Sequence, residues 1–205
     1  MRNAFAKELS NIAQKNKKIV LLSGDIGNRL FDNFRKNFPT RFHNCGIAEA
    51  SMTGIASGLA HLGLRPITYT IATFNTIRCL EQIKLDVCYS NLPVIIVGTG
   101  AGLSYSSLGS THHSIEDIAL LRSIPNLSIL CPSDPKEVKK LLNDAIKLKG
   151  PVYLRLGKKN EPVVESRRKI GKSNIIVNGK NNLIISELID SSREISLTYE
   201  DAFKI

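Results

Sequence analysis

The sequence contains no run of about 18 consecutive apolar residues and no signal-peptide pattern at its start. It therefore predicts neither a membrane-spanning helix nor export, and we expect a cytoplasmic protein without a membrane partner. The cysteines are few and stand singly in apolar surroundings, without C-x-x-C spacing; they are Cys45, Cys79, Cys88 and Cys131. This pattern predicts reduced, mostly buried thiols rather than disulfides or zinc ligands.

Several nucleotide and catalytic signatures are absent or incomplete. The Walker A pattern and the G-x-S-x-G elbow do not occur. A dinucleotide fingerprint begins at Gly98, but Leu103 stands where its last glycine belongs. His112 and His113 are adjacent, and no further ligand stands at a spacing typical of a metal site. We therefore predict no metal site in this chain.

Acidic residues are scarce in one segment, which explains much of the net charge of +10. Between Lys158 and Lys180 there are seven basic residues and two acidic ones, so this segment carries half of the net charge. No aromatic side chains interleave with the basic ones, although stacking on bases would require them. The pattern indicates a solvated basic linker rather than a nucleic-acid-binding surface.

Short apolar runs alternate with helical patterns along the chain, which predicts an α/β fold with a mostly parallel sheet flanked by helices. The expected strands are 19–23, 41–44, 66–70, 93–97, 127–130 and 152–156. The expected helices are 3–14, 30–37, 49–62, 76–89, 114–122 (with Ser114 as N-cap) and 135–148. Ligands of such sheets bind at the carboxyl ends of the strands, so we expect Asp25, Glu49, Phe74 and the segment 98–113 at the ligand edge.

The helix expected at 49–62 has two notable features. Its larger apolar residues recur at helical spacing and predict one apolar face; they are Met52, Ile55, Leu59 and Leu62. Gly54 and Gly58 cost helix stability, which predicts close packing against another backbone as compensation. Glu49 opens this helix, where an acid can simply favour the helix dipole. Its position alone leaves open whether Glu49 is a helix-end acid or a functional one.

Five motifs, taken in order, resemble the pyrimidine-binding domain of transketolases, and especially the separate C-terminal subunit of split bacterial transketolases. The motifs are Gly46-Ile-Ala-Glu-Ala50, Thr73-Phe74, Gly109-Ser-Thr-His-His-Ser-Ile-Glu-Asp117, Pro132-Ser-Asp134 and Gly150-Pro-Val-Tyr-Leu-Arg-Leu-Gly157. The resemblance covers residues 1 to about 156. It implies the transketolase-like pyrimidine-binding fold, which binds thiamine diphosphate.

The resemblance also implies residue roles toward the cofactor. The glutamate that matches Glu49 hydrogen-bonds atom N1′ of the aminopyrimidine ring and shares its proton. Phe74 matches the residue that stacks on this ring, and Ile77 stands in the same wall where transketolases often carry an aromatic residue. Asp25 matches an aspartate near the thiazolium ring, although a plain turn residue is an alternative.

Substrate positions agree with the family only in part. His112 matches a histidine that contacts substrate hydroxyl groups, and we expect His113 beside it in the same loop. Gly100 stands where a histidine is usual, and Leu108 stands where an aspartate often recognises the acceptor. These departures make ordinary pentose-phosphate transketolase activity doubtful.

The resemblance also implies that a partner is needed. The family binds the diphosphate and Mg²⁺ through a Gly-Asp-Gly motif with a downstream Asn, carried by a different domain, and this motif is missing here. We therefore expect a diphosphate-binding partner subunit that holds most of the Mg²⁺ site, in a dimer or heterotetramer. We expect a pyrimidine-binding domain at 1–157, a basic linker at 158–182, and at 183–205 a short tail or the truncated start of a C-terminal domain.

The expected activity is transfer of a two-carbon ketol unit between sugars, by the pyrimidine-side subunit of a thiamine-diphosphate-dependent enzyme. A 2-oxoacid dehydrogenase β-subunit has a similar domain and is one alternative. A catalytically silent partner subunit that kept the fold is another. The missing diphosphate motif and the altered substrate positions favour silence, whereas Glu49 and Phe74 favour catalysis.

Overall fold

A computed structural model describes residues 1–158, 161–163, 174–175, 185–186 and 189–190. Its main sheet has the strand order β2-β1-β3-β4-β6-β5-β9, in which the first six strands are parallel and β9 runs antiparallel to β5. The strands are β1 (Ile19–Ser23), β2 (Phe42–Asn44), β3 (Arg65–Ile71), β4 (Ile95–Thr99), β5 (Ser128–Leu130), β6 (Val152–Leu156) and β9 (Ile189–Asp190). The predicted α/β class with a mostly parallel sheet is confirmed.

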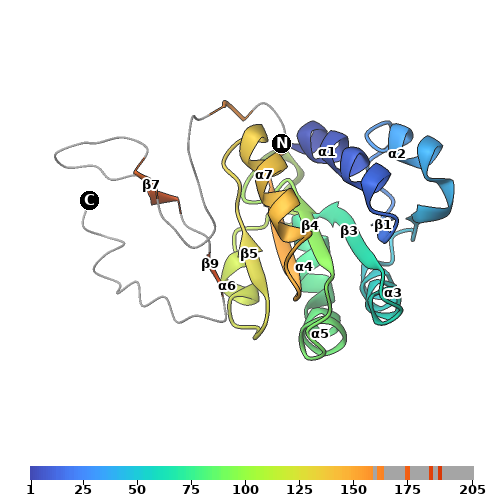
Figure 1. The fold of residues 1–205 in the computed structure, drawn as a ribbon. Helices are drawn as coiled ribbons and strands as arrows, with labels where there is room; N and C mark the ends of the chain where they lie inside the picture. Colours follow the sequence, from blue (N-terminus) through green and yellow to red (C-terminus); the bar gives the residue numbers. More distant parts are fainter. Residues whose placement is uncertain (159–160, 164–173, 176–184, 187–188, 191–205) are drawn as a thin grey trace, which may run out of the picture.

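Helices cover both faces of this sheet (Figure 1). The helices are α1 (Arg2–Lys15), α2 (Asp32–Asn37), α3 (Glu49–His61), α4 (Ala72–Thr76), α5 (Leu80–Gln82), α6 (Asp117–Leu121) and α7 (Pro135–Ala145). Short turns are η1 (Pro39–Arg41), η2 (Ile77–Cys79), η4 (Ser106–Leu108) and η5 (Ser110–His112), and η3 (Ile83–Cys88) is a π-helix. Strands β7 (Asn174–Ile175) and β8 (Ile185–Ser186) form a separate antiparallel pair.

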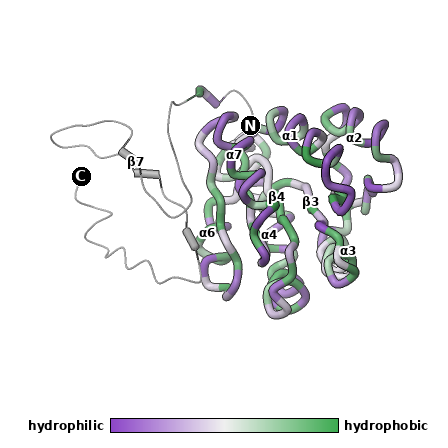
Figure 2. Tube along the Cα trace, viewed as in Figure 1, coloured by the Kyte–Doolittle hydropathy of each residue, from purple (hydrophilic) through white to green (hydrophobic). Residues whose placement is uncertain are grey.

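Alternate residues of the central strands point to opposite faces of the sheet and pack in two separate cores. Ile19 and Leu21 of β1 point into the core under α1, α2 and α7. Val20 and Leu22 point into the core under α3, the α4–η3 segment and α6. Because both faces are covered, the central strands β1, β3 and β4 are buried along their whole length, as is typical of parallel sheets. Figure 2 shows green segments concentrated toward the sheet, while the outer helices carry much of the purple.

The apolar face predicted for α3 is largely wrong. Met52 is fully buried, but Ile55 is half-exposed and Leu62 is 80% exposed. The face that packs on the sheet instead uses smaller residues, including Ala56 and Ala60, because short side chains let the helix approach the sheet closely. Of the larger side chains, Ile55 lies on the outer face, whereas Met52 packs in the core.

Two local expectations also need correction. The helix predicted over 76–89 is broken into η2, α5 and the π-helix η3. The predicted N-cap Ser114 instead pairs by backbone with Gly102, and α6 begins only at Asp117, with Glu116 as N-cap. An extended bridge holds the chain at Ser114, so the helix cannot start there.

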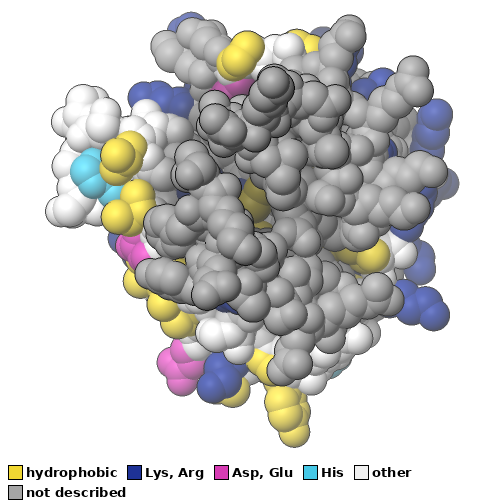
Figure 3. All heavy atoms as spheres, turned by 90° about the vertical axis from the view of Figure 1, so that its left-hand side faces the viewer, with side chains coloured by type: hydrophobic (Ala, Val, Ile, Leu, Met, Phe, Trp, Pro, Cys, Tyr) yellow, Lys and Arg dark blue, Asp and Glu magenta, His cyan; other side chains and the backbone are white. Residues whose placement is uncertain are grey.

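Most of the predicted basic linker and of the segment 183–205 lies outside the described residues, so these boundaries stay predictions. In the described part of the chain, no helix is both long and apolar enough to cross a membrane. Figure 3 shows described basic side chains on several sides of the rim of the face in view.

Candidate functional site

The carboxyl ends of β1 and β3 meet the start of α3. A Cβ atom built on Gly24, directly after β1, would lie 3.4 Å from Cγ of Glu49 and 3.0 Å from Cβ of Thr70. Glycine therefore lets the turn after β1 lie close to Thr70 on β3, while the Glu49 side chain lies at ordinary contact distance. The fold thus brings Glu49 to the ligand edge expected from the strand order.

Glu49 is buried with a charged partner. Its side chain is 1% exposed, and its Oε2 accepts a hydrogen bond of 2.6 Å from Nη1 of Arg78. Its Oε1 is also buried and has no hydrogen-bond partner among the described residues. A buried carboxylate oxygen without a donor is energetically costly, so this atom is suited to accept a hydrogen bond from a ligand.

Arg78 connects Glu49 with Phe74. The guanidinium carbon of Arg78 lies 4.6 Å from the centre of the Phe74 ring, a cation–π arrangement. The centres of the His112 and Phe74 rings lie 5.2 Å apart, and the rings form a T-shaped pair with an interplanar angle of 69°. Four side chains from three separate segments therefore form one continuous cluster, which includes the predicted Glu49, Phe74 and His112.

The segment that carries Phe74 and Arg78 is fixed to the sheet. Nδ2 of Asn75 donates to Oγ1 of Thr68 at 3.1 Å and to the Val97 carbonyl at 2.9 Å. A Cβ atom on Gly98 would meet Cα of Ala72 at 2.9 Å, so glycine allows α4 to lie directly on β4. These contacts explain why the chain leaves a regular helix here and turns Arg78 toward Glu49.

Asp25 is exposed and lies at the edge of the site. Its backbone is left-handed, with φ of +57°, and its Oδ1 accepts a hydrogen bond of 2.8 Å from Nδ2 of Asn44. Oδ1 of Asn44 in turn accepts from the backbone N–H groups of Asp25 and Gly46, at 3.1 and 3.0 Å. Asn44 therefore ties Asp25 to the turn that leads into Glu49.

His113 does not join the cluster in the way that His112 does. Its Nε2 lies 3.3 Å from the carbonyl oxygen of Ser106, within its own loop. Nδ1 of His112 lies 3.0 Å from Oγ1 of Thr111, and its ring faces Phe74. Adjacent residues diverge in direction, so the two histidines have different surroundings.

A buried polar network anchors the histidine loop to the sheet. Asp117 is fully buried, and its Oδ2 accepts hydrogen bonds from the Tyr153 hydroxyl at 2.7 Å and from Nε of Arg155 at 2.8 Å. Burial, followed by the charge of Asp117, raises the pKa of Tyr153 well above its ordinary value. Burial lowers the pKa of Arg155, but the hydrogen bond and charge of Asp117 outweigh it, and the net pKa is raised. The Tyr153 hydroxyl and the Arg155 guanidinium therefore keep their protons and remain donors to Asp117.

The sequence analysis did not predict the roles of Arg78 and Asn44 in the site. Arg78 follows Phe74 by four residues, the spacing at which helical neighbours meet, and this signal could have identified it. Ile77, a predicted cofactor residue, opens η2 and is 40% exposed. In the described ranges, no three or more His, Cys, Asp or Glu residues are grouped to hold a metal.

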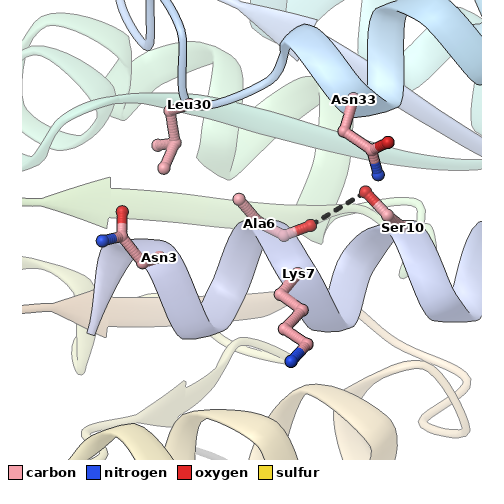
Figure 4. Close-up of a pocket in the computed structure, with 6 residues that line it drawn as sticks. All are labelled: Asn3, Ala6, Lys7, Ser10, Leu30 and Asn33. Carbon is pink, nitrogen blue, oxygen red and sulfur yellow. Dashed lines mark hydrogen bonds between the residues drawn. The ribbon is translucent and has the colours of Figure 1, made fainter.

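A pocket of about 260 Å³ lies elsewhere, between α1 and the start of α2 (Figure 4). Its lining includes none of the predicted site residues; it is formed by Asn3, Ala6, Lys7, Ser10, Leu30 and Asn33. The hydroxyl of Ser10 donates to the Ala6 carbonyl at 3.0 Å and is thus already satisfied.

Comparison with known families agrees with this fold. The family described as "Transketolase, pyrimidine binding domain" matches residues 1–163. A match over this share of the chain shows that the protein belongs to that family.

Several relatives are named as transketolase subunits. The chain is 37% identical to one subunit of the apulose-4-phosphate transketolase of Phocaeicola vulgatus, over 90% of this chain and 61% of that protein. It is 45% identical to the subunit of the same name from Actinobacillus succinogenes, over 65% of this chain and 43% of that one. A solved structure titled "Split gene transketolase, inactive beta4 tetramer" superposes with a TM-score of 0.77 at 37% identity, covering 88% of this chain and 59% of that one. The chain thus spans about three fifths of the length of the first of these relatives.

Proposed function

We propose that this chain is the pyrimidine-side subunit of a thiamine-diphosphate-dependent, transketolase-like transferase that moves a two-carbon ketol unit between sugars. The observation that carries the proposal is Glu49, a buried carboxylate at a helix start with one oxygen unpartnered in the described chain, which Arg78 links to the Phe74 ring. Membership of the pyrimidine-binding family supports it.

The residues present fit the aminopyrimidine half of the cofactor. Oε1 of Glu49 is free to bind N1′, and Phe74 is a half-buried ring that can stack on a flat heteroaromatic partner. When bound, the cofactor supplies an electron sink for cleavage of the ketose carbon–carbon bond. Glu49 holds and returns the proton at N1′, a general acid–base role. His112, whose ring meets that of Phe74, would contact substrate hydroxyl groups.

The diphosphate and Mg²⁺ are assigned to a partner subunit, because this sequence lacks the Gly-Asp-Gly motif and its downstream Asn. The names of the relatives, which are subunits of split enzymes, support this division. Relatives named for apulose 4-phosphate suggest a sugar phosphate as the substrate class.

Exposed apolar side chains support subunit association. Ile55 lies on α3 and Leu62 directly follows it, while Leu85 and Tyr89 lie on and beside η3, and all four are at least 48% exposed. The two elements pack side by side. A relative of known structure is titled a tetramer, and we propose that this surface contacts a second subunit.

Reconstitution tests the function. The purified chain is mixed with the diphosphate-side subunit from the same genome, and activity is measured with ketose phosphates and with 2-oxoacids. We expect cofactor-dependent ketol transfer. Activity on 2-oxoacids alone would instead identify a dehydrogenase β-subunit, and activity on neither, with a stable complex, would identify a silent partner.

A further inference from the structure

One guanidinium occupies both groups that we assign to the aminopyrimidine ring. Nη1 of Arg78 donates to Oε2 of Glu49 at 2.6 Å, while the guanidinium carbon lies 4.6 Å from the centre of the Phe74 ring. The proposed function requires these same two side chains for the ring. The inference below rests on that assignment.

The Arg78 guanidinium and the aminopyrimidine ring have similar requirements for binding. A guanidinium is planar, stacks on aromatic faces, and presents N–H donors along its edge to a carboxylate. An aminopyrimidine ring that shares a proton at N1′ has the same requirements: a flat face for stacking and an edge donor for a carboxylate. Glu49 and Phe74 therefore recognise Arg78 by the features that would recognise the ring.

Arg78 is able to leave, whereas Glu49 is not. The Arg78 side chain is 46% exposed and lies on the short turn η2, so its guanidinium can rotate into water without crossing a core. Glu49 is 1% exposed and stands in α3, between strand ends and the rest of its helix. The ion pair therefore opens by movement of Arg78 alone.

We propose that Arg78 and the aminopyrimidine ring compete for the Phe74 ring beside the Glu49 carboxylate, so that Arg78, held there by Oε2 of Glu49, acts as a latch on the cofactor site. Before the exchange, Arg78 is the counter-ion of the buried carboxylate and covers the Phe74 ring. After the exchange, the ring stacks on Phe74 and binds the free Oε1 of Glu49, and the guanidinium leaves Oε2 and moves to solvent. The latch lowers the apparent affinity for the cofactor by the fraction of time it is open.

The test compares cofactor affinity in the reconstituted complex, by calorimetric titration with thiamine diphosphate and Mg²⁺. Arg78→Ala removes the latch, and Arg78→Lys keeps a charge but not the planar group. Arg35→Ala is the matched control, because it removes an arginine from an exposed ion pair with Asp32 on α2. If the latch is closed nine-tenths of the time, Arg78→Ala binds about tenfold more tightly than wild type. Arg78→Lys falls between them, and the control equals wild type.

A second measurement follows Arg78 itself in the wild-type complex. Phenylglyoxal modifies exposed guanidinium groups, and the extent at Arg78 is read by mass spectrometry with and without thiamine diphosphate. We expect faster modification with the cofactor, because the guanidinium is released. Circular dichroism would reveal whether Arg78→Ala fails to fold. In that case the modification of Arg78 in the wild-type complex still tests the latch.

The outcomes separate the latch from the proposed function. If wild type binds the cofactor but Arg78→Ala binds equally or more weakly, the latch is wrong and the cofactor assignment stands; Arg78 then holds the Glu49 carboxylate in place instead. Slower modification of Arg78 with cofactor leads to the same conclusion. If the wild-type complex binds no thiamine diphosphate, both proposals are wrong.

Discussion

The hydroxyl of Tyr153, on β6, donates a hydrogen bond of 2.7 Å to the carboxylate of Asp117, which begins α6, 36 residues earlier in the chain. Arg155 donates to the same oxygen and lies 3.3 Å, through Nη2, from the carbonyl oxygen of Ser114. The loop that carries His112 ends at Ser114. This network therefore fixes the histidine loop against a strand of the central sheet.

Breaking the network at one side is expected to destabilise both the fold and the loop. Arg155→Met leaves the fully buried Asp117 without its charged partner and should cost roughly 3–5 kcal/mol in the free energy of unfolding. Tyr153→Phe removes one neutral donor and should cost about 1–3 kcal/mol. Urea denaturation measures both, and hydrogen exchange of residues 102–116 reports the loop.

A matched control is Lys147→Met, which removes an exposed ion pair with Asp144 on α7. Exposed pairs contribute about 0–1 kcal/mol, so this variant should unfold at nearly the wild-type urea concentration. If Arg155→Met is no less stable than the control, the network does not anchor the loop.

The sequence predicted the sheet more accurately than the helices' packing. Apolar runs located the inner strands, because strands covered on both faces are largely apolar, whereas the edge strand β2 (Phe-His-Asn) was predicted only as a short extended run. The spacing of Ile55 and Leu62 correctly predicted a helix, but it did not show that these side chains are exposed. Helical periodicity cannot distinguish burial within one chain from contact with a second subunit.

The site was predictable only where local motifs specify it. Glu49, Phe74 and His112 were identified through motifs, and the fold brings them into one cluster. Arg78 reaches Glu49 across 29 residues of sequence, and its direction depends on the anchoring of Asn75 to the sheet. The spacing from Phe74 could have indicated that Arg78 meets that ring, but its contact with Glu49 leaves no local pattern in the sequence.

Substitution of Gly58 tests whether a second subunit packs on the outer face of α3. A Cβ atom built there meets nothing within 4 Å in the described chain, so the expected close backbone approach does not occur within this chain. Gly58→Ala should stabilise the isolated chain by about 0.5–1 kcal/mol, because alanine is the better helix former. If a second subunit packs on this face, the added methyl group should weaken association, measured by sedimentation.

Gln14→Ala, at an exposed position of α1, provides the comparison and should not change association. Unchanged sedimentation of Gly58→Ala would show that the outer face of α3 does not bind another subunit. The stability gain should persist in either case, since it depends on the helix alone.

We predict that the buried thiol of Cys88 lowers the free energy of unfolding at alkaline pH. Burial raises its thiol pKa from 9.0 to about 12. A folded-state pKa above the unfolded value means that stability is fully present below pH 9 and is lost as the pH rises toward 12. Cys88→Ala should therefore lose less stability than wild type between about pH 8 and 11, by urea denaturation. Arg65, whose pKa burial lowers to about 10, is common to both proteins and cancels in the difference. Parallel pH profiles of the two proteins would contradict the prediction.

Glu49→Gln tests the proposed acid–base residue. Glutamine keeps the size and can still hydrogen-bond, but it cannot take and return the proton at N1′. General acid–base groups contribute roughly 10²–10⁴-fold, so turnover of the reconstituted complex should fall by at least that order. The fold should survive, because Arg78 is half-exposed and can be hydrated once its ion pair is lost.

The direct measurement is the rate of proton exchange at C2 of the bound cofactor, which needs no sugar substrate. Glu81→Gln, at an exposed position of α5, is the matched control and should exchange at the wild-type rate. If Glu49 only favours the helix dipole, Glu49→Gln should cost about 0.3–1 kcal/mol of stability and leave exchange unchanged. A wild-type exchange rate in Glu49→Gln would therefore refute the catalytic assignment, whereas slow exchange with retained cofactor binding would show that proton transfer, rather than binding, depends on this carboxylate.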